Sequence, residues 1–225
     1  MYQFVTGPLL WLSFAVFFIG LIARIVLYIR GLNWKLDRVT YRVNTRYGVK
    51  GALKSVFFWL LPFGARNWRV KPWFTLLFFA FHAGLVITPI FLLAHAVLLK
   101  ERWGLGWPAI SNQTADVLTV VVIVAAVFLV LRRLALPEVR IMTTAYDYLL
   151  IAVTVAPFIT GFIAGFGGEN YQTWLIVHVL TGEIWLVAVP FTKLAHVVLF
   201  FCSRVQLGMD FGIKRGGLKG RGLVW

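Results

Sequence analysis

The sequence predicts an all-α membrane protein, a bundle of five transmembrane helices, and three observations lead to that prediction. Of the 225 residues, 60% are hydrophobic and only 13% are charged, whereas ordinary globular chains carry about 25% charged residues. The mean hydropathy of +0.85 reflects more apolar surface than one water-soluble core of this size can bury. Five stretches are also long enough to cross a bilayer core about 30 Å thick, which takes about 20 helical residues. A soluble globular enzyme is therefore excluded.

The five predicted spans follow one another along a single integral membrane domain, residues 1–225. The first lacks a basic region ahead of its apolar run and is long enough to cross the bilayer, so we do not interpret it as a cleavable signal peptide. The third is the shortest; it is rich in valine and is followed by Arg132 and Arg133. The predicted spans are residues 4–28, 73–99, 115–131, 146–166 and 174–202.

Two segments outside the spans have a character of their own. Residues 49–63, VKGALKSVFFWLLPF, combine Lys50 and Lys54 with large apolar side chains and are too short to span. We interpret them as a helix lying at the membrane interface; part of a small cytoplasmic cap is the alternative. Residues 203–225 form a basic tail whose end is rich in glycine.

The basic residues predict the orientation. The net charge is +14, and nineteen of the 22 lysines and arginines fall in three places: from Arg24, near the end of the first span, through Lys71; in the loop after the third span; and in the tail. The positive-inside rule therefore puts the N-terminus outside and the C-terminus in the cytoplasm. An odd number of spans requires such opposite ends. This explanation of the charge removes nucleic acid as a partner.

Cys202 is the one cysteine of the chain. A single thiol excludes a disulfide framework, a C-x-x-C zinc site, a C-x-x-C-H haem attachment and a cysteine-ligated iron–sulfur cluster.

All four histidines, His82, His95, His178 and His196, lie in the second and fifth spans. Ionisable residues inside membranes are normally disfavoured, so two on each of two helices indicate paired ligation; four unrelated interhelical hydrogen bonds are the alternative. The orientation pairs them by depth, His82 with His196 near the cytoplasm and His95 with His178 near the outside. Two histidines at one depth on facing helices can hold a haem iron.

Helix geometry leaves one mismatch in this pairing. On unbroken helices the 13 residues from His82 to His95 span about 19.5 Å, and the 18 residues from His178 to His196 span about 27 Å. The first two histidines would also lie about 140° apart around their helix. A strong tilt of the fifth helix, or a bend at Pro190, would bring the two spacings closer.

Two further charges lie in the fifth span. Glu183 could accept protons from a quinol near the outer haem, or make a hydrogen bond between helices. Lys193 could hold a haem propionate or a partner's carboxylate, or extend to the cytoplasmic interface.

Five spans, an outer N-terminus, histidine pairs confined to the second and fifth spans and 18 residues between the last pair resemble the gamma subunit of respiratory nitrate reductase. That subunit is a membrane cytochrome b with two haems. The length and the start MYQFVTGPLLW are most similar to the members in Hmc (high-molecular-weight cytochrome c) type redox complexes of sulfate-reducing bacteria. The spacing of 13 in the second span departs from the nitrate reductase subunit and is closer to cytochromes of the bc type.

The resemblance implies two haem b groups, the outer on His95 and His178 and the inner on His82 and His196, in the bacterial cytoplasmic membrane. It further implies electron transfer between an outer quinone pool, such as menaquinone, or a periplasmic multihaem cytochrome c and a cytoplasmic iron–sulfur subunit. Other membrane subunits would complete the complex, and a reaction with quinone would make the chain part of a membrane oxidoreductase. The alternative is a cofactor-free membrane anchor, or a small proton-linked transporter that uses buried histidines.

Overall fold

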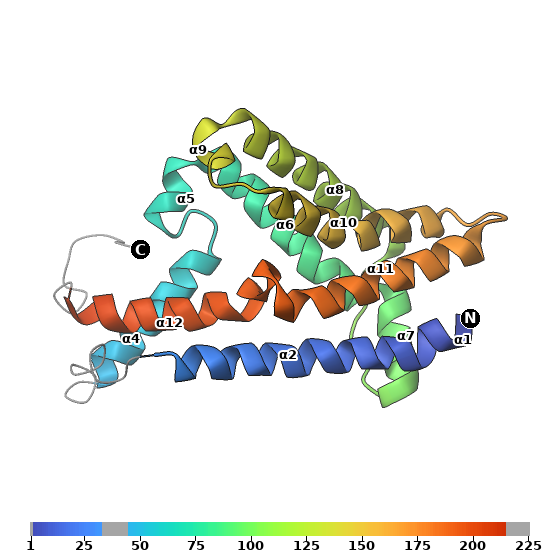
Figure 1. Ribbon diagram of the computed structural model, residues 1–225, viewed down its shortest axis with the longest axis horizontal. Helices are drawn as coiled ribbons and strands as arrows, with labels where there is room; N and C mark the ends of the chain where they lie inside the picture. The colour runs from blue at the N-terminus through green and yellow to red at the C-terminus, as the bar shows by residue number, and fades with distance from the viewer. Residues whose placement is uncertain (1, 33–44, 215–225) are drawn as a thin grey trace. The chain divides into compact units, whose positions relative to one another are not determined.

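Helices joined by short connections make up the residues that the computed structural model describes, 2–32 and 45–214 (Figure 1). Helices account for 86% of these described residues, and no strand occurs in the two ranges. The all-α prediction is confirmed. The helices are α1 (Tyr2–Phe4), η1 (Val5–Leu9, a π-helical turn), α2 (Leu10–Arg30), α4 (Thr45–Leu60), α5 (Arg66–Val70), α6 (Pro72–Phe91), α7 (Leu93–Trp103), α8 (Asn112–Ala135), α9 (Pro137–Arg140), α10 (Ala145–Gly165), α11 (Tyr171–Phe191), η2 (Lys193–Ala195, a 3₁₀ turn) and α12 (His196–Lys214).

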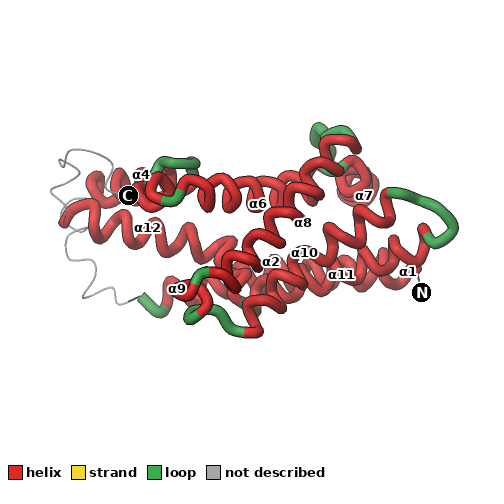
Figure 2. Tube along the Cα trace, turned by 90° about the horizontal axis from the view of Figure 1, so that it is seen from above, coloured by secondary structure: helices red, strands yellow, loops and turns green. Residues whose placement is uncertain are grey.

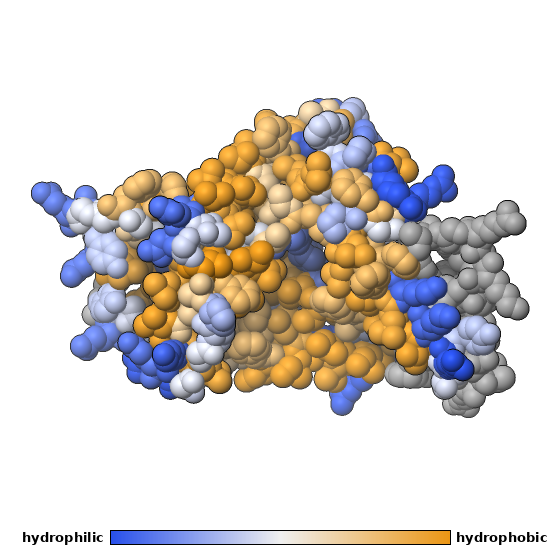
Figure 3. Space-filling model, turned by 180° about the vertical axis from the view of Figure 1, so that it is seen from behind, coloured by the Kyte–Doolittle hydropathy of each residue, from blue (hydrophilic) through white to orange (hydrophobic). Residues whose placement is uncertain are grey.

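Five of the described helical segments are long and apolar enough to cross a membrane, so the protein is a multi-pass membrane protein. Large apolar side chains remain exposed on them, among them Ile19, Val117 and Leu149, and hydrophobic residues dominate the face in Figure 3. Such a surface requires contact with lipid. The observed candidate spans are Tyr2–Arg30, Pro72–Phe91, Asn112–Ala135, Ala145–Gly165 and Tyr171–Phe191.

The second and fifth of these spans are shorter than predicted, because both helices break. α6 ends at Phe91, and Leu92 takes an extended conformation with φ −60° and ψ 130° before α7 begins. α11 ends at Phe191, and Thr192 is extended before η2 and α12. Pro89 and Pro190 lie just ahead of the two breaks, and proline lacks the N–H that the helix needs. The spans predicted at residues 73–99 and 174–202 are therefore each interrupted; the break after Pro190 lies where a bend of the fifth helix was one of the two expectations.

The helices form two compact units, and each is described by itself. The first unit comprises residues 1–11 and 76–185, and the second comprises residues 12–75 and 186–225. α2, α6 and α11 contribute residues to both. The single integral membrane domain stays a prediction.

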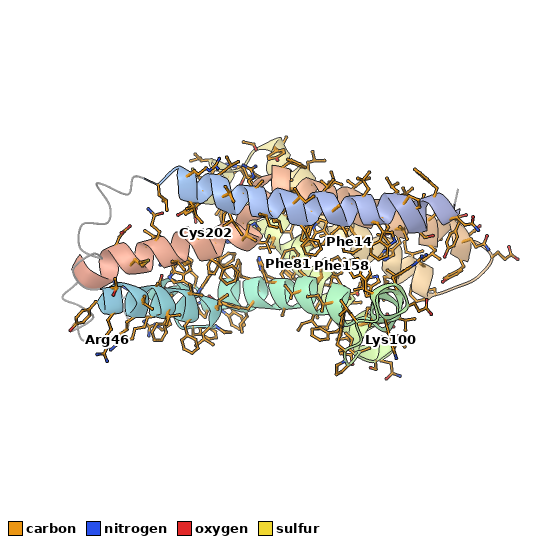
Figure 4. The ribbon with its side chains drawn as sticks, turned by 90° about the horizontal axis from the view of Figure 1, so that it is seen from below. Phe14, Arg46, Phe81, Lys100, Phe158 and Cys202 are labelled. Atoms are coloured by element: carbon orange, nitrogen blue, oxygen red, sulfur yellow. The ribbon has the colours of Figure 1, made fainter. Side chains whose placement is uncertain are left out.

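The core of the first unit lies between α6, α8 and α10, and α8 runs beside α10 (Figures 1 and 2). Phe81 and Phe158, labelled in Figure 4, enter it from α6 and α10. A Cβ at Gly84 would lie 2.4 Å from Cγ2 of the fully buried Val122, so α6 and α8 approach closely there. Gly84, a small residue beside His82, thus serves helix packing.

The second unit packs α4 along α12 (Figure 2). The buried face of α4 carries small residues, Gly48, Gly51, Ala52 and Ser55, and its exposed face carries Val49, Leu53 and Phe57. The amphipathic helix predicted at residues 49–63 is therefore present over Thr45–Leu60. Its position at a membrane interface stays a prediction.

Gly208 allows the contact between α4 and α12, so its replacement should separate them. A Cβ at Gly208 would lie 2.5 Å from the carbonyl oxygen of Gly51 and 2.7 Å from Cβ of Ser55. Backbone cannot yield as a flexible side chain does, so we expect Gly208→Ala to destabilise the protein by about 1–3 kcal/mol. Thermal unfolding in detergent measures this. Gly165→Ala, which meets nothing within 4 Å, is the control and should leave the midpoint unchanged.

Candidate functional site

The break after Pro89 creates the position of His95. The last carbonyls of a helix have no partner within it, and here three groups beyond the break supply one. Nδ1 of His95 lies 2.9 Å from the carbonyl oxygen of Pro89. Nε1 of Trp107 donates to Ile90 at 2.8 Å, and the backbone N–H of Ile110 donates to Phe91 at 2.9 Å. The imidazole of His95 is therefore fixed at the C-terminal end of α6.

His178 on α11 is held against α10. Its Nδ1 lies 2.9 Å from the carbonyl oxygen of Pro157. The backbone carbonyl of His178 accepts from the hydroxyl of Thr181 at 2.9 Å, and that hydroxyl lies 3.1 Å from the hydroxyl of Thr160 on α10. Thr160 in turn donates to the carbonyl of Ala156 at 2.8 Å. These hydrogen bonds fix both the ring and the helical turn that carries it.

Gly161 leaves room for the His178 ring. A Cβ at Gly161 would lie 2.8 Å from both Cε1 and Nδ1 of that ring, which is closer than carbon and nitrogen can approach without displacement. α10 therefore presents a glycine where the imidazole passes.

The structure brings His95 and His178 together. Their ring centroids are 6.0 Å apart and their planes differ by 5°. A metal ion held by one nitrogen of each ring, at the distance of about 2.0–2.1 Å that imidazole makes with a transition metal, would put the centroids roughly 6–6.5 Å apart. The observed separation and parallel planes fit two imidazoles that share one metal ion.

The hydrogen bonds also select the nitrogen that could bind a metal. A carbonyl oxygen only accepts, so in a neutral ring Nδ1 carries the proton and Nε2 keeps its lone pair. For His95 and His178, Nε2 has no hydrogen-bond partner in the described parts of the chain. A carbonyl on the far nitrogen is the arrangement that orients metal-binding histidines. The pair therefore fits a bis-histidine haem.

The other two histidines show the same bond. Nδ1 of His82 lies 2.8 Å from the carbonyl of Phe78, and Nδ1 of His196 lies 3.0 Å from that of Lys193. His82 belongs to the first unit and His196, the first residue of α12, to the second. Their pairing across the two units stays a prediction.

Glu183 is buried, with 4% of its surface exposed, and neither carboxylate oxygen has a hydrogen-bond partner among residues 2–32 and 45–214. An interhelical hydrogen bond thus finds no acceptor or donor there. Lys193 lies in η2, with its side chain exposed. Its backbone carbonyl lies 3.0 Å from Nδ1 of His196.

Sequence reasoning missed three features of the site. Pro157 and Gly161 on α10 contact His178, although the fourth span carried no candidate residue. The third feature is the helix break ahead of His95 and of His196, and the sequence carried a sign of it, because Pro89 and Pro190 each precede a histidine by six residues.

Within the described ranges no group of three or more histidines, cysteines or carboxylates could hold a metal ion, so any metal site there has fewer protein ligands.

Comparisons with known proteins give a relative along the whole chain. A protein of Nitratidesulfovibrio vulgaris strain Hildenborough, described simply as "Protein", is 53% identical over 226 residues that cover 100% of both chains. The chain belongs to the family of that protein. No protein-family model matches the chain, and no solved structure does either.

Proposed function

We propose that this protein is a b-type cytochrome with two haems, a membrane subunit that carries electrons across the cytoplasmic membrane within a larger respiratory complex. The observation that supports it most directly is the His95–His178 pair, with centroids 6.0 Å apart and parallel rings. The bonds from Nδ1 to backbone carbonyls in all four histidines add to it.

In this proposal His95 and His178 hold the outer haem and His82 and His196 the inner one. Haem iron supplies reversible one-electron transfer, which no side chain of this chain offers. The protein's own part is to fix the ligands: the carbonyls of Pro89 and Pro157 keep the proton on Nδ1, and Thr181 and Thr160 hold the turn of His178. Rigid ligands lower the reorganisation that accompanies each electron transfer.

Partners would supply the remaining chemistry. An outer quinone, such as menaquinone, or a periplasmic multihaem cytochrome c would exchange electrons with the outer haem, and a cytoplasmic iron–sulfur subunit with the inner one. Glu183 is the candidate for accepting quinol protons, because its buried carboxylate has no partner among the described residues. The same buried group favours the second candidate function, a cofactor-free, proton-linked membrane protein.

A reduced-minus-oxidised spectrum of the purified protein, with a haem count, tests the proposal. We expect a b-type spectrum and two haems per chain. His178→Ala and His95→Ala should each remove the same haem, and His82→Ala and His196→Ala should each remove the other. A protein that shows no spectral change with dithionite and no extractable haem would refute the proposal and leave the proton-linked alternative. Removal of the same haem by His82→Ala and His178→Ala would refute the pairing alone.

A further inference from the structure

Arg204 on α12 is held against α4 in the second unit without a carboxylate. Its Nε and Nη2 donate to the hydroxyl of Ser55 at 3.0 and 2.8 Å. Its guanidinium carbon lies 4.5 Å from the ring centroid of Trp59. Ser55 is fully buried, so one short side chain and one aromatic face orient this cation. A guanidinium carries five N–H groups on its three nitrogens. Two of these nitrogens, Nε and Nη2, each donate to the Ser55 hydroxyl, so the other N–H groups remain available.

Trp59 adds a second unused donor at the same place. Its Nε1 is buried and has no acceptor within residues 2–32 and 45–214. The ring is held by Trp68 of α5, whose centroid lies 5.3 Å away and whose Nε1 donates to the carbonyl of Trp59. A buried indole N–H normally has an acceptor. The N–H of Trp59 therefore requires an acceptor that the described residues do not supply, and the remaining N–H groups of the half-buried Arg204 are available to the same acceptor.

The surroundings favour an anionic acceptor. Burial lowers the pKa of the Arg204 guanidinium from its usual value, although arginine stays charged at neutral pH. A bound anion would offset that desolvation. Among the described side chains of the second unit, Asp210 is the one carboxylate against ten cations. The cations are Arg24, Arg30, Arg46 (Figure 4), Lys50, Lys54, Arg66, Arg69, Lys71, Lys193 and Arg204.

α4 also presents an apolar face, on the side of the helix away from Ser55. Val49, Leu53 and Phe57 lie at helical spacing and are 52%, 67% and 58% exposed. Apolar residues that can enter the acyl region, next to cations at headgroup level, are the features of an interfacial helix that binds anionic lipid. A small soluble anion would use the cations and not the apolar stripe.

We propose that Arg204, oriented by Ser55, and Nε1 of Trp59 bind the phosphate of an anionic phospholipid headgroup, while the exposed apolar face of α4 enters the same membrane surface. The site is separate from the four histidines and does not depend on the proposed haems. Arginine suits it because its planar fork can donate two parallel hydrogen bonds to one phosphate. The lipid would then tie α4 and α12 together at the membrane surface.

Lipid retention by the full-length protein tests the site. The protein is reconstituted in vesicles of equal parts phosphatidylcholine and phosphatidylglycerol and extracted in mild detergent. Native mass spectrometry then measures which lipids remain bound to it. We expect phosphatidylglycerol to be retained preferentially. Arg204→Gln should lower its retention roughly five- to tenfold, and Ser55→Ala and Arg204→Lys should lower it less. Arg66→Gln removes the same charge from an exposed position and should change retention little.

Each other outcome overturns the lipid site. Equal retention of the two lipids by the wild-type protein, or equal loss in Arg204→Gln and Arg66→Gln, would show only a diffuse basic surface. Displacement of the bound lipid by millimolar inorganic phosphate would indicate a site for a free anion. A shifted haem reduction potential in Arg204→Gln with unchanged lipid retention would assign the guanidinium to a haem carboxylate. If Arg204→Gln does not fold, Arg204→Lys and Ser55→Ala carry the comparison.

Discussion

Gly161→Ala should remove one of the two proposed haems and leave the other in place. The added Cβ would lie 2.8 Å from Cε1 and Nδ1 of His178, so the ring must turn or move away from α10. Either movement breaks the hydrogen bond to the carbonyl of Pro157, and with it the parallel alignment with His95. A bis-histidine site tolerates little misplacement, since both ligands must reach one iron. The haem count per chain and the number of redox transitions should both fall from two to one.

Gly165→Ala supplies a matched control on the same helix. Gly165 lies one turn beyond Gly161, and a Cβ there meets nothing within 4 Å. Both variants change glycine to alanine in α10, so differences in helix propensity largely cancel. We expect Gly165→Ala to keep both haems. Equal haem content in the two variants, whether complete or reduced, would mean that the His178 ring has no ligand role that depends on its contact with α10.

The composition and the apolar runs were enough to predict the helices. Lipid-facing segments must satisfy their backbone hydrogen bonds internally, and continuous apolar stretches of about 20 residues or more, such as residues 112–135, have the length of a spanning helix. The amphipathic α4 was visible because Lys50 and Lys54 accompany a run of large apolar residues that is too short to span. The depth pairing of His95 with His178 also agrees with the observed contact, since it depended only on chain direction.

The local geometry of the site could not be predicted in the same way. Whether a proline bends a helix or ends it depends on which groups donate hydrogen bonds to the backbone carbonyls that are left without a partner in the helix. The helix can end after Pro89 because groups of His95, Trp107 and Ile110 form hydrogen bonds with its last carbonyls. After Pro190, Nε of Arg24 donates to the Pro190 carbonyl at 2.6 Å, and Gly20 lets α2 approach the proline ring. Apart from His95, these partners lie well outside the local sequence of the two prolines, so the sequence alone could not predict that the helices end there.

Replacement of Glu183 should stabilise the protein while it impairs reaction with quinol. A buried carboxyl without a hydrogen-bond partner costs about 1–3 kcal/mol relative to a satisfied or apolar group. Both Glu183 oxygens lack a partner among the described residues, so Glu183→Leu should raise the free energy of unfolding by about that amount. Thermal unfolding in detergent measures the gain. A residue that only joined two helices would show the opposite sign.

The rate of haem reduction by quinol tests whether the carboxyl group of Glu183, which destabilises the fold, takes part in that reaction. If Glu183 accepts the protons of a quinol, Glu183→Gln should slow haem reduction by a menaquinol analogue about 10²-fold or more, while reduction by dithionite stays unchanged. Glu169→Gln, at an exposed turn, is the matched control and should change neither rate. A Glu183→Gln variant that still reacts with quinol at the wild-type rate would separate the buried carboxyl group from the quinone. A proton-linked function without haem would then be the better explanation of why an unpartnered carboxyl group remains in the span.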